Sequence, residues 1–357
     1  MRAAICEGPQ KVLVKDIRTP NPSPGDVLIK VWVAGVCGSD VRVYMGKHPE
    51  VVYPIILGHE FSGEIAALGE GVDNFNIGDE VIVDPTMPCG ECYACYSGNY
   101  NLCSESVSIG YQLPGAFAEY TTANANMVHL KDEDLTLEEA ALINPLAVAI
   151  HAVKRAGISI GEMVVILGAG TVGLLTMQVA KQSGAKVIST DVSTDKLHLA
   201  AALGADYVIN SEGSDPGDLV MELTKDQGVD AVIECAGTLQ TELQMVDLVK
   251  PGGKIVMVGW TGNKLDQISL TKITLNEINL LGSANHCNEF STAVKLATSG
   301  LINLNSLISH EFDISETAEA LEEMSRNQHE MIKPIISFLP EEDEDEYEYE
   351  DDEELED

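Results

Sequence analysis

Basic residues are scarce in this sequence. Lys and Arg number 21 against 57 Asp and Glu, and the formal net charge at pH 7 is −36. Binding to a nucleic-acid backbone needs clustered Lys and Arg, so we expect no nucleic-acid partner. The scarcity is most pronounced at residues 341–357, which hold 14 acidic side chains and no basic one. We expect this C-terminal run to be a disordered, solvating tail; the alternative is an acidic docking element for a basic partner.

Long apolar runs are also missing. No run approaches the roughly 18 residues that span a bilayer, and residues 1–6 lack the apolar region of a secretory signal. We therefore expect a cytoplasmic protein with no membrane partner. Hydrophobic residues still make up 45% of the 357 residues, which suits two domains with sizeable cores.

Cysteine is sparse and unevenly placed. In a chain without an export signal, a cluster of four cysteines with the others scattered indicates metal binding in a reducing compartment rather than a disulfide framework. Four thiolates in the spacing Cys-x2-Cys-x2-Cys-x7-Cys can surround one tetrahedral zinc and leave no position for water, which predicts a structural site. An iron–sulfur cluster is the alternative, although the Cys-Pro of the bacterial cluster motif is absent. The four clustered residues, out of eight, are Cys89, Cys92, Cys95 and Cys103.

The apolar pattern divides the chain into parts. Residues 1–83 are typical of short strands and turns, and residues 84–110 form a Cys-, Pro- and Gly-rich loop without apolar periodicity. A helix is predicted over 137–156. From 163 to about 285, short buried strands alternate with helices, which favours a parallel sheet covered on both faces. Two helical stretches and a last strand over 333–338 follow.

The fold class is therefore α/β, with two domains. The most economical layout has a β-rich domain at 1–145, which includes loop 84–110, and a nucleotide-type domain at 146–285. Residues 286–340 then return to the first domain.

A glycine-rich motif, GAGTVG at residues 168–173, follows a predicted strand and opens a predicted helix. In such a motif the first glycine permits a tight turn, the second lets the backbone approach a pyrophosphate, and the third lets helix and strand pack closely. Asp191 ends the next predicted strand, where a carboxylate accepts hydrogen bonds from ribose hydroxyls and repels a 2′-phosphate. The motif therefore favours NAD over NADP; a turn made only for packing is the alternative.

Two short motifs offer a further set of ligands. They are Cys37-Gly38-Ser39-Asp40 and Gly58-His59-Glu60. Singly, each is ordinary, because a buried Cys behaves as a small hydrophobe and a lone His is more often a satisfied core or surface residue. Together they supply the thiolate, imidazole and carboxylate of an open catalytic zinc site.

In this order, and together with GAFAEY at 115–120, the motifs resemble the zinc-dependent medium-chain alcohol dehydrogenases, in particular the sorbitol (polyol) and threonine dehydrogenase branch. The resemblance covers residues 1 to about 340. It implies a GroES-like catalytic domain, a Rossmann domain and a cleft between them. It also implies two zinc ions per subunit, NAD, a small alcohol or ketone as substrate, and a homodimer or homotetramer.

The resemblance assigns roles by position. Cys37, His59 and Glu60 match the catalytic zinc ligands, and Ser39 matches the hydroxyl that relays the substrate proton. The four clustered cysteines match the structural zinc site. The matching cofactor contacts are Gly168, Gly170, Thr171, Val172, Gly173, Asp191, Lys196, Val258, Trp260, Ser283 and Asn285.

Three departures from the family pattern concern the substrate. Asn144 replaces a Glu that approaches the metal in polyol dehydrogenases, and it can hydrogen-bond or weakly coordinate without charge. Arg42 replaces the His at the outer end of the proton relay and cannot shuttle a proton at neutral pH. Asn285-His286 replaces an Arg-Tyr pair that faces the polyol.

The resemblance implies an oxidoreductase that interconverts a secondary alcohol, such as a polyol or related sugar alcohol, and its ketone by hydride transfer. Two alternatives are a non-zinc quinone or enoyl reductase on the same scaffold, and an inactive NAD-binding protein that docks through its acidic tail.

Overall fold

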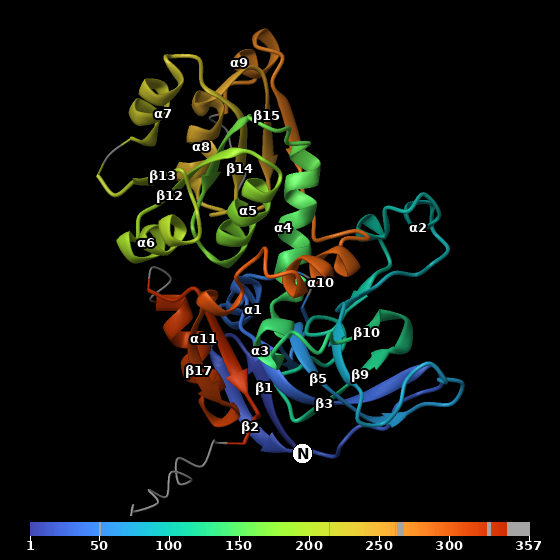
Figure 1. Ribbon diagram of the computed structural model, residues 1–357. Coiled ribbons are helices and arrows are strands. Elements are labelled where there is room, and N and C mark those ends of the chain that lie inside the picture. Colours follow the sequence, from blue (N-terminus) through green and yellow to red (C-terminus); the bar gives the residue numbers. More distant parts are fainter. Residues whose placement is uncertain (50, 214, 261, 263–267, 327–329, 341–357) are drawn as a thin grey trace, which may run out of the picture.

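Figure 1 shows the computed structural model of the chain. It describes all residues except 50, 214, 261, 263–267, 327–329 and 341–357. The predicted acidic tail at 341–357 lies outside the described residues. A parallel-sheet unit lies above an N-terminal, β-rich unit in this view, and helix α4 runs between the two (Figure 1).

The N-terminal unit contains most of the short strands that its Val-rich, Pro-punctuated sequence predicts. Its strands are β1 (Arg2–Gly8), β2 (Lys11–Asp16), β3 (Asp26–Gly35), β4 (Ile55–Ile56), β5 (Glu60–Leu68), β6 (Glu80–Val83), β7 (Thr86–Met87), β8 (Val107–Ser108), β9 (Tyr120–Asn124) and β10 (Val128–Leu130). Its helices are α1 (Gly38–Tyr44), α2 (Tyr93–Tyr96), α3 (Leu137–Ala141), and the 3-10 turns η1 (Tyr100–Leu102) and η2 (Ala125–Met127).

The C-terminal residues complete the sheet that the N-terminal residues begin. The seven-stranded sheet runs in the order β10-β6-β5-β3-β18-β17, and β9 also pairs with β3. Strand β18 pairs antiparallel to β3, with Ile336 opposite Ala34. The returning elements are α10 (Phe290–Thr298), η3 (Asn305–Leu307), β17 (Ile308–Asp313), η4 (Ile314–Glu316), α11 (Thr317–Arg326) and β18 (Lys333–Ser337). The domain limits at 145, 285 and 340 stay predictions.

The other unit is a six-stranded sheet in which every pairing is parallel. Its strand order is β13-β12-β11-β14-β15-β16, which is 3-2-1-4-5-6 in chain order and defines a Rossmann sheet. The order reverses between β11 and β14, and ligands bind at the carboxyl ends of strands at such a point. The elements are β11 (Met163–Leu167), α5 (Thr171–Gln182), β12 (Lys186–Asp191), α6 (Thr194–Ala202), β13 (Tyr207–Asn210), α7 (Pro216–Thr224), β14 (Val229–Glu234), α8 (Leu239–Leu248), β15 (Val249–Met257), α9 (Leu270–Leu275) and β16 (Asn279–Gly282).

The single helix predicted over 137–156 is wrong in one respect. The structure has two helices, α3 and α4 (Ile143–Ala156), separated at Leu142. Pro145 has no N–H to bond to the carbonyl of Ala141, so a continuous helix would lose that bond. The new helix instead starts at Ile143 and places Pro145 in its first turn, where no such bond is needed. This break sets the position of Asn144.

Helix α4 lies in a hydrophobic core that spans both units. Its buried face, which includes Leu146 and Ala149, packs in one cluster with Ile166 of β11 and with Leu304 and Ile335 of the returning segment. Burial on this scale fixes the two units against each other. Among the described residues, no helix is long and apolar enough to cross a membrane.

Candidate active site and metal centres

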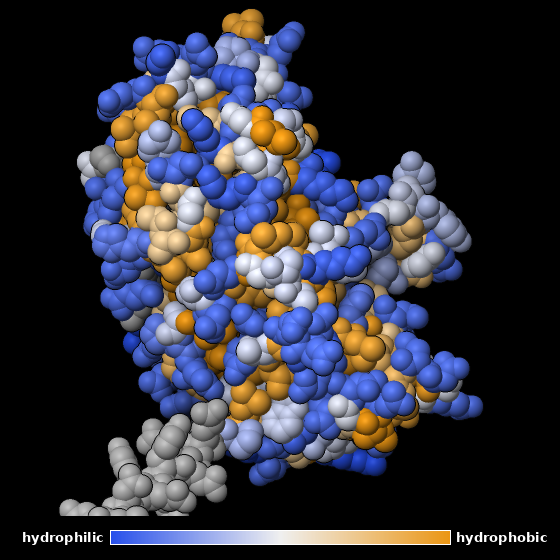
Figure 2. All heavy atoms as spheres, viewed as in Figure 1, coloured by the Kyte–Doolittle hydropathy of each residue, from blue (hydrophilic) through white to orange (hydrophobic). Residues whose placement is uncertain are grey.

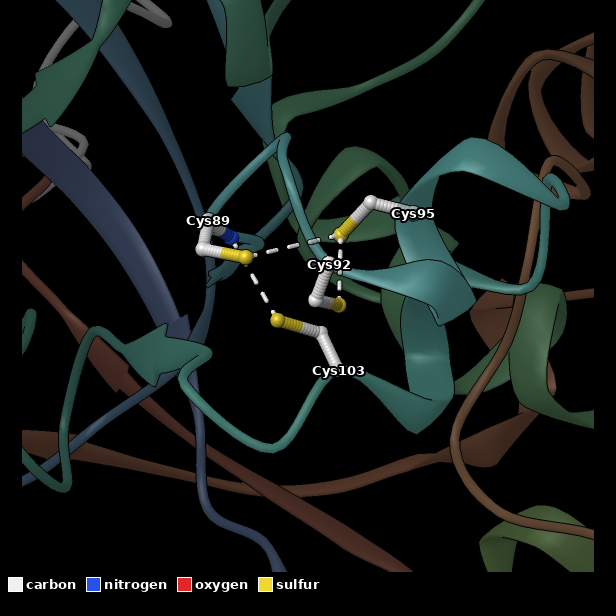
Figure 3. Close-up of side chains that lie close together, drawn as sticks. All are labelled: Cys89, Cys92, Cys95 and Cys103. Atoms are coloured by element: carbon white, nitrogen blue, oxygen red, sulfur yellow. Dashed lines mark hydrogen bonds between the residues drawn. The ribbon is translucent and has the colours of Figure 1, made fainter.

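Four cysteine side chains converge in a lobe that projects from the body of the molecule, as Figures 2 and 3 show. We call residues 89–103 the cysteine lobe. The Sγ of Cys95 lies 3.5 Å from that of Cys92 and 3.9 Å from that of Cys89, and the Sγ of Cys103 accepts the N–H of Cys89. A tetrahedral zinc with Zn–S bonds of about 2.3 Å separates its sulfurs by about 3.8 Å. The four thiols therefore fit one such ion.

A second group of three ligands lies where the two units meet. Cys37 precedes α1, His59 precedes β5, and Glu60 is the first residue of β5. One ligand atom from each lies within 4.8 Å of the others. A thiolate, an imidazole and a carboxylate at this spacing fit a zinc with a position left for a further ligand. The structure thus brings together the three residues that two separate motifs supply.

Asp40 organises this group. Its buried carboxylate accepts the backbone N–H of Cys37 at 2.9 Å, and it lies 3.3 Å from the Nδ1 of His59. This arrangement leaves the Nε2 of His59 facing the other ligands, as in metal sites where a carboxylate orients the histidine. Burial lowers the pKa of His59, but Asp40 and Cys37 together raise that pKa well above its usual value. A bound cation would displace this proton.

Glu60 has a cationic partner from the far end of the chain. The Nζ of Lys333, on β18, lies 2.5 Å from the Oε2 of Glu60 and donates to the carbonyl of Val36 at 3.1 Å. Both side chains are buried, with exposed fractions of 2% and 3%. Burial lowers the pKa of Lys333, but the negative charges of Glu60, Cys37 and Asp40 together more than compensate and raise that pKa, so this lysine is charged. The pair leaves Oε1 as the oxygen of Glu60 that faces His59, 4.0 Å away.

Ser39 has a partner that the sequence did not indicate. The phenol of Tyr111 donates to the Oγ of Ser39 at 2.6 Å, and Ser39 in turn donates to the Sγ of Cys37 at 3.1 Å. The ring of Tyr111 lies 5.0 Å from that of His59. Burial, followed by the negative charges of Asp40 and Cys37, raises the pKa of Tyr111 well above its usual value. The phenol therefore stays protonated and donates a hydrogen bond to Ser39.

Aromatic side chains connect the two units beside this site. His48 stacks on Tyr111 at 4.9 Å and meets Trp260 edge-on at 5.8 Å. The guanidinium of Arg42 lies over the Trp260 ring and donates to its backbone carbonyl. Arg42 therefore occupies the junction between the units and is held there by Trp260.

Asn144 lies in a buried polar cluster with His286 and Asp84. The Nε2 of His286 lies 3.1 Å from the Oδ1 of Asn144 and 3.6 Å from the Oδ1 of Asp84. Burial lowers the pKa of His286 to about 4, so the ring is neutral. An amide oxygen only accepts, so Nε2 carries the hydrogen. Nδ1 is buried and has no hydrogen-bond partner in the described part of the chain.

The glycine-rich turn has the shape that a dinucleotide requires. Gly168 has a φ of +97°, and a Cβ there would lie 2.8 Å from the Cβ of Ala236. A Cβ on Gly173 would lie 1.9 Å from the carbonyl oxygen of Gly168, whereas one on Gly170 would meet nothing within 4 Å. Any side chain at Gly168 or Gly173 would therefore clash with its neighbours, so close packing requires glycine at both positions. Gly170, at the N-terminus of α5, leaves open space in front of the first N–H groups of the helix. Such a position suits a phosphate.

Asp191, the predicted ribose contact, supports the glycine-rich turn. It accepts the N–H of Ala169 at 2.7 Å and that of Ser193 at 2.9 Å. Lys196 is buried nearby, and burial lowers its pKa. The hydroxyl of Thr171 donates to the carbonyl of Ile332, so only its backbone faces the turn.

The remaining predicted cofactor contacts follow the carboxyl ends of neighbouring strands. Val258 and Trp260 follow β15, and Ser283 and Asn285 follow β16. The Oγ of Ser283 is buried without a partner in the described part of the chain. The side chain of Asn285 donates instead to the Oγ1 of Thr86, so it is directed at the N-terminal unit. Val172 lies in the first turn of α5.

Comparison with known proteins agrees with this geometry. Residues 23–133 match the alcohol dehydrogenase GroES-like domain, and residues 171–299 match the zinc-binding dehydrogenase family. A sorbitol dehydrogenase from Halalkalibacterium halodurans is 41% identical over 307 residues, which are 84% of this chain and 89% of that protein. The chain belongs to the zinc-type medium-chain alcohol dehydrogenases. Within this family it is similar to the sorbitol dehydrogenase branch.

Two solved structures of the family were determined with a cofactor. One is described as an alcohol dehydrogenase from Escherichia coli CFT073 in complex with NADH; it has a TM-score of 0.89 and 31% identity over 95% of this chain and 99% of that one. The other is a zinc-binding dehydrogenase from Sinorhizobium meliloti bound to NADP, with a TM-score of 0.88 and 31% identity over 94% and 98%. The GroES-like and Rossmann architecture expected from the sequence is thereby confirmed.

Sequence reasoning missed the partners of the site. Asp40 was visible inside its motif but received no role. Tyr111 and Lys333 reach the site from distant elements, and a lysine at the start of a strand gives no signal of burial. His286 was noted only as a departure from the family pattern.

Proposed function

We propose that the protein is an NAD-dependent dehydrogenase that interconverts a secondary alcohol, of the polyol class, and its ketone. The observation that carries the proposal is the convergence of Cys37, His59 and Glu60 beside Ser39, where the two units meet. Zinc bound to the three ligands supplies a Lewis acid that makes a substrate hydroxyl acidic near neutral pH, and NAD accepts the hydride. The cysteine lobe holds a second, structural zinc.

Ser39 relays the substrate proton in this proposal: as its Oγ takes that proton, its own hydroxyl proton would pass on towards the cofactor ribose and solvent. One lone pair of its Oγ accepts from Tyr111, and the other is available to a substrate hydroxyl. Asp40 holds His59 in the tautomer that leaves Nε2 for the metal. Arg42 stays charged and takes no part in proton transfer.

Asp191 selects NAD over NADP. A carboxylate beside the ribose repels a 2′-phosphate. Hydrogen bonds from the backbone N–H groups of Ala169 and Ser193 hold the Asp191 side chain in place. Asp191→Ala should raise the KM for NAD and reduce the preference over NADP. Unchanged preference between the two cofactors would contradict this role.

The substrate class follows from similarity and from the polar lining. The sorbitol dehydrogenase relative acts on a polyol by its name, and here the phenol of Tyr111 is a neutral polar group beside Ser39 and His59. We propose a cytoplasmic homodimer or homotetramer, as is usual for the family.

The experiment is NADH formation at 340 nm with zinc-loaded protein on polyols, sugar phosphates, 2,3-butanediol and L-threonine, with NAD and NADP in parallel. We expect NAD-dependent oxidation of a polyol that a chelator abolishes. Activity on quinones or enoyl compounds that needs no zinc would overturn the proposal. Protein that binds NADH but oxidises no alcohol would favour the inactive alternative.

A further inference from the structure

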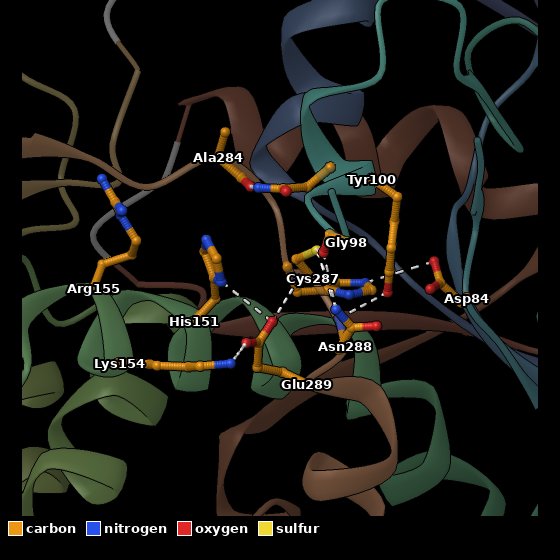
Figure 4. Close-up of polar contacts among 12 residues, drawn as sticks. Asp84, Gly98, Tyr100, His151, Lys154, Arg155, Ala284, Cys287, Asn288 and Glu289 are labelled. Carbon is orange, nitrogen blue, oxygen red and sulfur yellow. Dashed lines mark hydrogen bonds and ion pairs between the residues drawn. The ribbon is translucent and has the colours of Figure 1, made fainter. Parts of the chain in front are cut away.

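The cysteine lobe is tied to a segment almost two hundred residues further along the chain. We call residues 284–288 the crossing segment (Figure 4). The amide of Asn101 donates to the carbonyl of Ala284 at 2.9 Å, and the backbone N–H of Asn288 donates to the phenol oxygen of Tyr100 at 2.9 Å. The carbonyl of Gly98 accepts the thiol of Cys287 at 3.0 Å and the amide of Asn288 at 3.2 Å. All the lobe residues involved lie between Cys95 and Cys103.

The backbone of the crossing segment is strained at two residues and depends on surrounding contacts to keep its conformation. Asn285 and Asn288 have φ values of +52° and +66°, in the left-handed region that non-glycine residues seldom adopt. Such conformations persist where surrounding contacts over-determine them. Here the side chain of Asn285 is anchored to Thr86. The contacts to the lobe hold the other end at Asn288.

The segment is anchored on its other side to α4. Glu289 accepts the N–H of Cys287, lies 2.7 Å from the Nζ of Lys154, and lies 3.2 Å from the Nδ1 of His151 (Figure 4). Arg155 donates to the carbonyl of Gly282, at the end of β16. The crossing segment is therefore held by contacts to α4 on one side and to the cysteine lobe on the other.

These contacts fix the position of His286, which is fully buried. Its Nε2 contacts the Oδ1 of Asn144 at the start of α4. The same segment continues from Ser283, which follows a strand of the Rossmann sheet at its carboxyl end. One short stretch thus connects the lobe to both halves of the proposed active site.

The lobe has little of its own to keep its shape. Neither α2 nor η1 contains a buried residue, and Tyr93 of α2 is 88% exposed. A loop without an apolar core depends on its metal for rigidity. Through its contacts from Gly98, Tyr100 and Asn101, a rigid lobe also restrains the crossing segment.

We propose that the cysteine lobe is a positioning element of the active site: through Tyr100 and Asn101 it holds residues 284–288 so that His286 fixes Asn144 and Ser283 borders the cofactor. Tyr100 and Asn101 are therefore positioning residues for the reaction. The claim about catalysis rests on the proposed function; the claim about the crossing segment does not.

The test compares Tyr100→Phe and Asn101→Ala with two controls from the same lobe, Tyr93→Phe and Asn99→Ala. Tyr93 is exposed, and the side-chain amide of Asn99 donates to Ser97 within the lobe. Each zinc-loaded protein is measured for zinc content, Tm, NADH affinity by fluorescence, kcat and KM. Backbone hydrogen exchange is followed over residues 283–289.

We expect all four variants to keep two zinc ions and a Tm close to that of the unaltered protein. Tyr100→Phe and Asn101→Ala should speed exchange at 283–289 at least fivefold, weaken NADH binding severalfold and lower kcat about tenfold, whereas the controls should do none of this. The effects of Tyr100→Phe and His286→Asn on kcat should be non-additive, because both act through one segment.

Exchange at 283–289 that matches the controls would overturn the inference, whatever the activity. Loss of activity that follows only a loss of zinc or of Tm would overturn it equally, since the lobe would then be merely structural. Unaltered protein that neither binds NADH nor oxidises an alcohol would instead refute the proposed function, and the exchange measurement would still decide the role of the lobe.

Discussion

At the scale of single residues, the site is built around charges that are buried in pairs. Asp40 lies beside His59, and Lys333 is paired with Glu60, so two of the three proposed metal ligands have a charged partner of their own. The proposed ligands Cys37, His59 and Glu60 could be picked out from sequence because they lie in short motifs, and the structure places them together. Asp40 lies in the same motif as Cys37, but its contact with His59 depends on the fold. Tyr111 and Lys333 come from distant parts of the chain that only the fold brings near.

Replacing the partner of Glu60 should be costly. Lys333→Met leaves a buried carboxylate unpaired, which typically destabilises a protein by about 3–5 kcal/mol. We expect a lower free energy of unfolding of that order and a weaker hold on the catalytic zinc, measured by urea titration and metal analysis. Lys295→Met, at an exposed position of α10, is the matched control and should change neither. Equal stability of the two variants would show that Glu60 does not depend on Lys333.

Asp84 should make stability depend on pH. Burial raises the pKa of Asp84 to about 7, from 3.8. Between these values the folded state holds a proton that the unfolded state has released, so this group makes stability fall as pH rises from about 4 to about 7. Asp84→Asn keeps an acceptor for the N–H of Thr86 and removes the charge. The variant should match the unaltered protein near pH 4 and exceed its stability by about 4 kcal/mol at pH 8.

The measurement is chemical unfolding of both proteins at each pH. His286, with a pKa lowered to about 4, contributes with the opposite sign below its ordinary pKa, so the two proteins are compared at the same pH. A difference that does not grow with pH would show that Asp84 is ionised throughout.

At the scale of elements, local sequence predicted the strands and helices of the Rossmann sheet well. Each strand there is a short apolar run, and the glycine-rich motif indicates the first strand–helix junction. The division of the helix at Leu142 was missed because Pro145 falls within the first turn of α4, a position where proline is tolerated in a helix. The crossing segment was missed because its contacts reach back to the cysteine lobe.

The glycine-rich turn offers a matched pair of substitutions. Gly170→Ala adds a methyl group where nothing lies within 4 Å, so stability should hardly change while NADH binds at least tenfold more weakly. Gly168→Ala forces a methyl group against Ala236 at a φ of +97°, so it should lower stability as well. Thermal unfolding and NADH fluorescence measure both. NADH affinity that Gly170→Ala leaves unchanged would place the pyrophosphate elsewhere.

At the scale of the whole molecule, two units meet along α4, and the proposed chemistry lies where they meet. The N-terminal unit supplies the metal ligands, the parallel sheet supplies the dinucleotide turn, and the last strand returns to deliver Lys333. The sequence predicted this layout from its alternation of patterns and from family resemblance. It could not predict which side chains cross between the units, such as Arg42 with Trp260, because those contacts depend on how the units are placed.

The most direct test of the central claim is the zinc content, NADH affinity and alcohol oxidation of Cys37→Ser beside the unaltered protein. If Cys37, His59 and Glu60 form the catalytic centre, the unaltered protein holds two zinc ions and the variant about one. The variant should still bind NADH, because the glycine-rich turn is untouched, and it should oxidise no alcohol. Turnover that survives in a variant with one zinc would contradict the account.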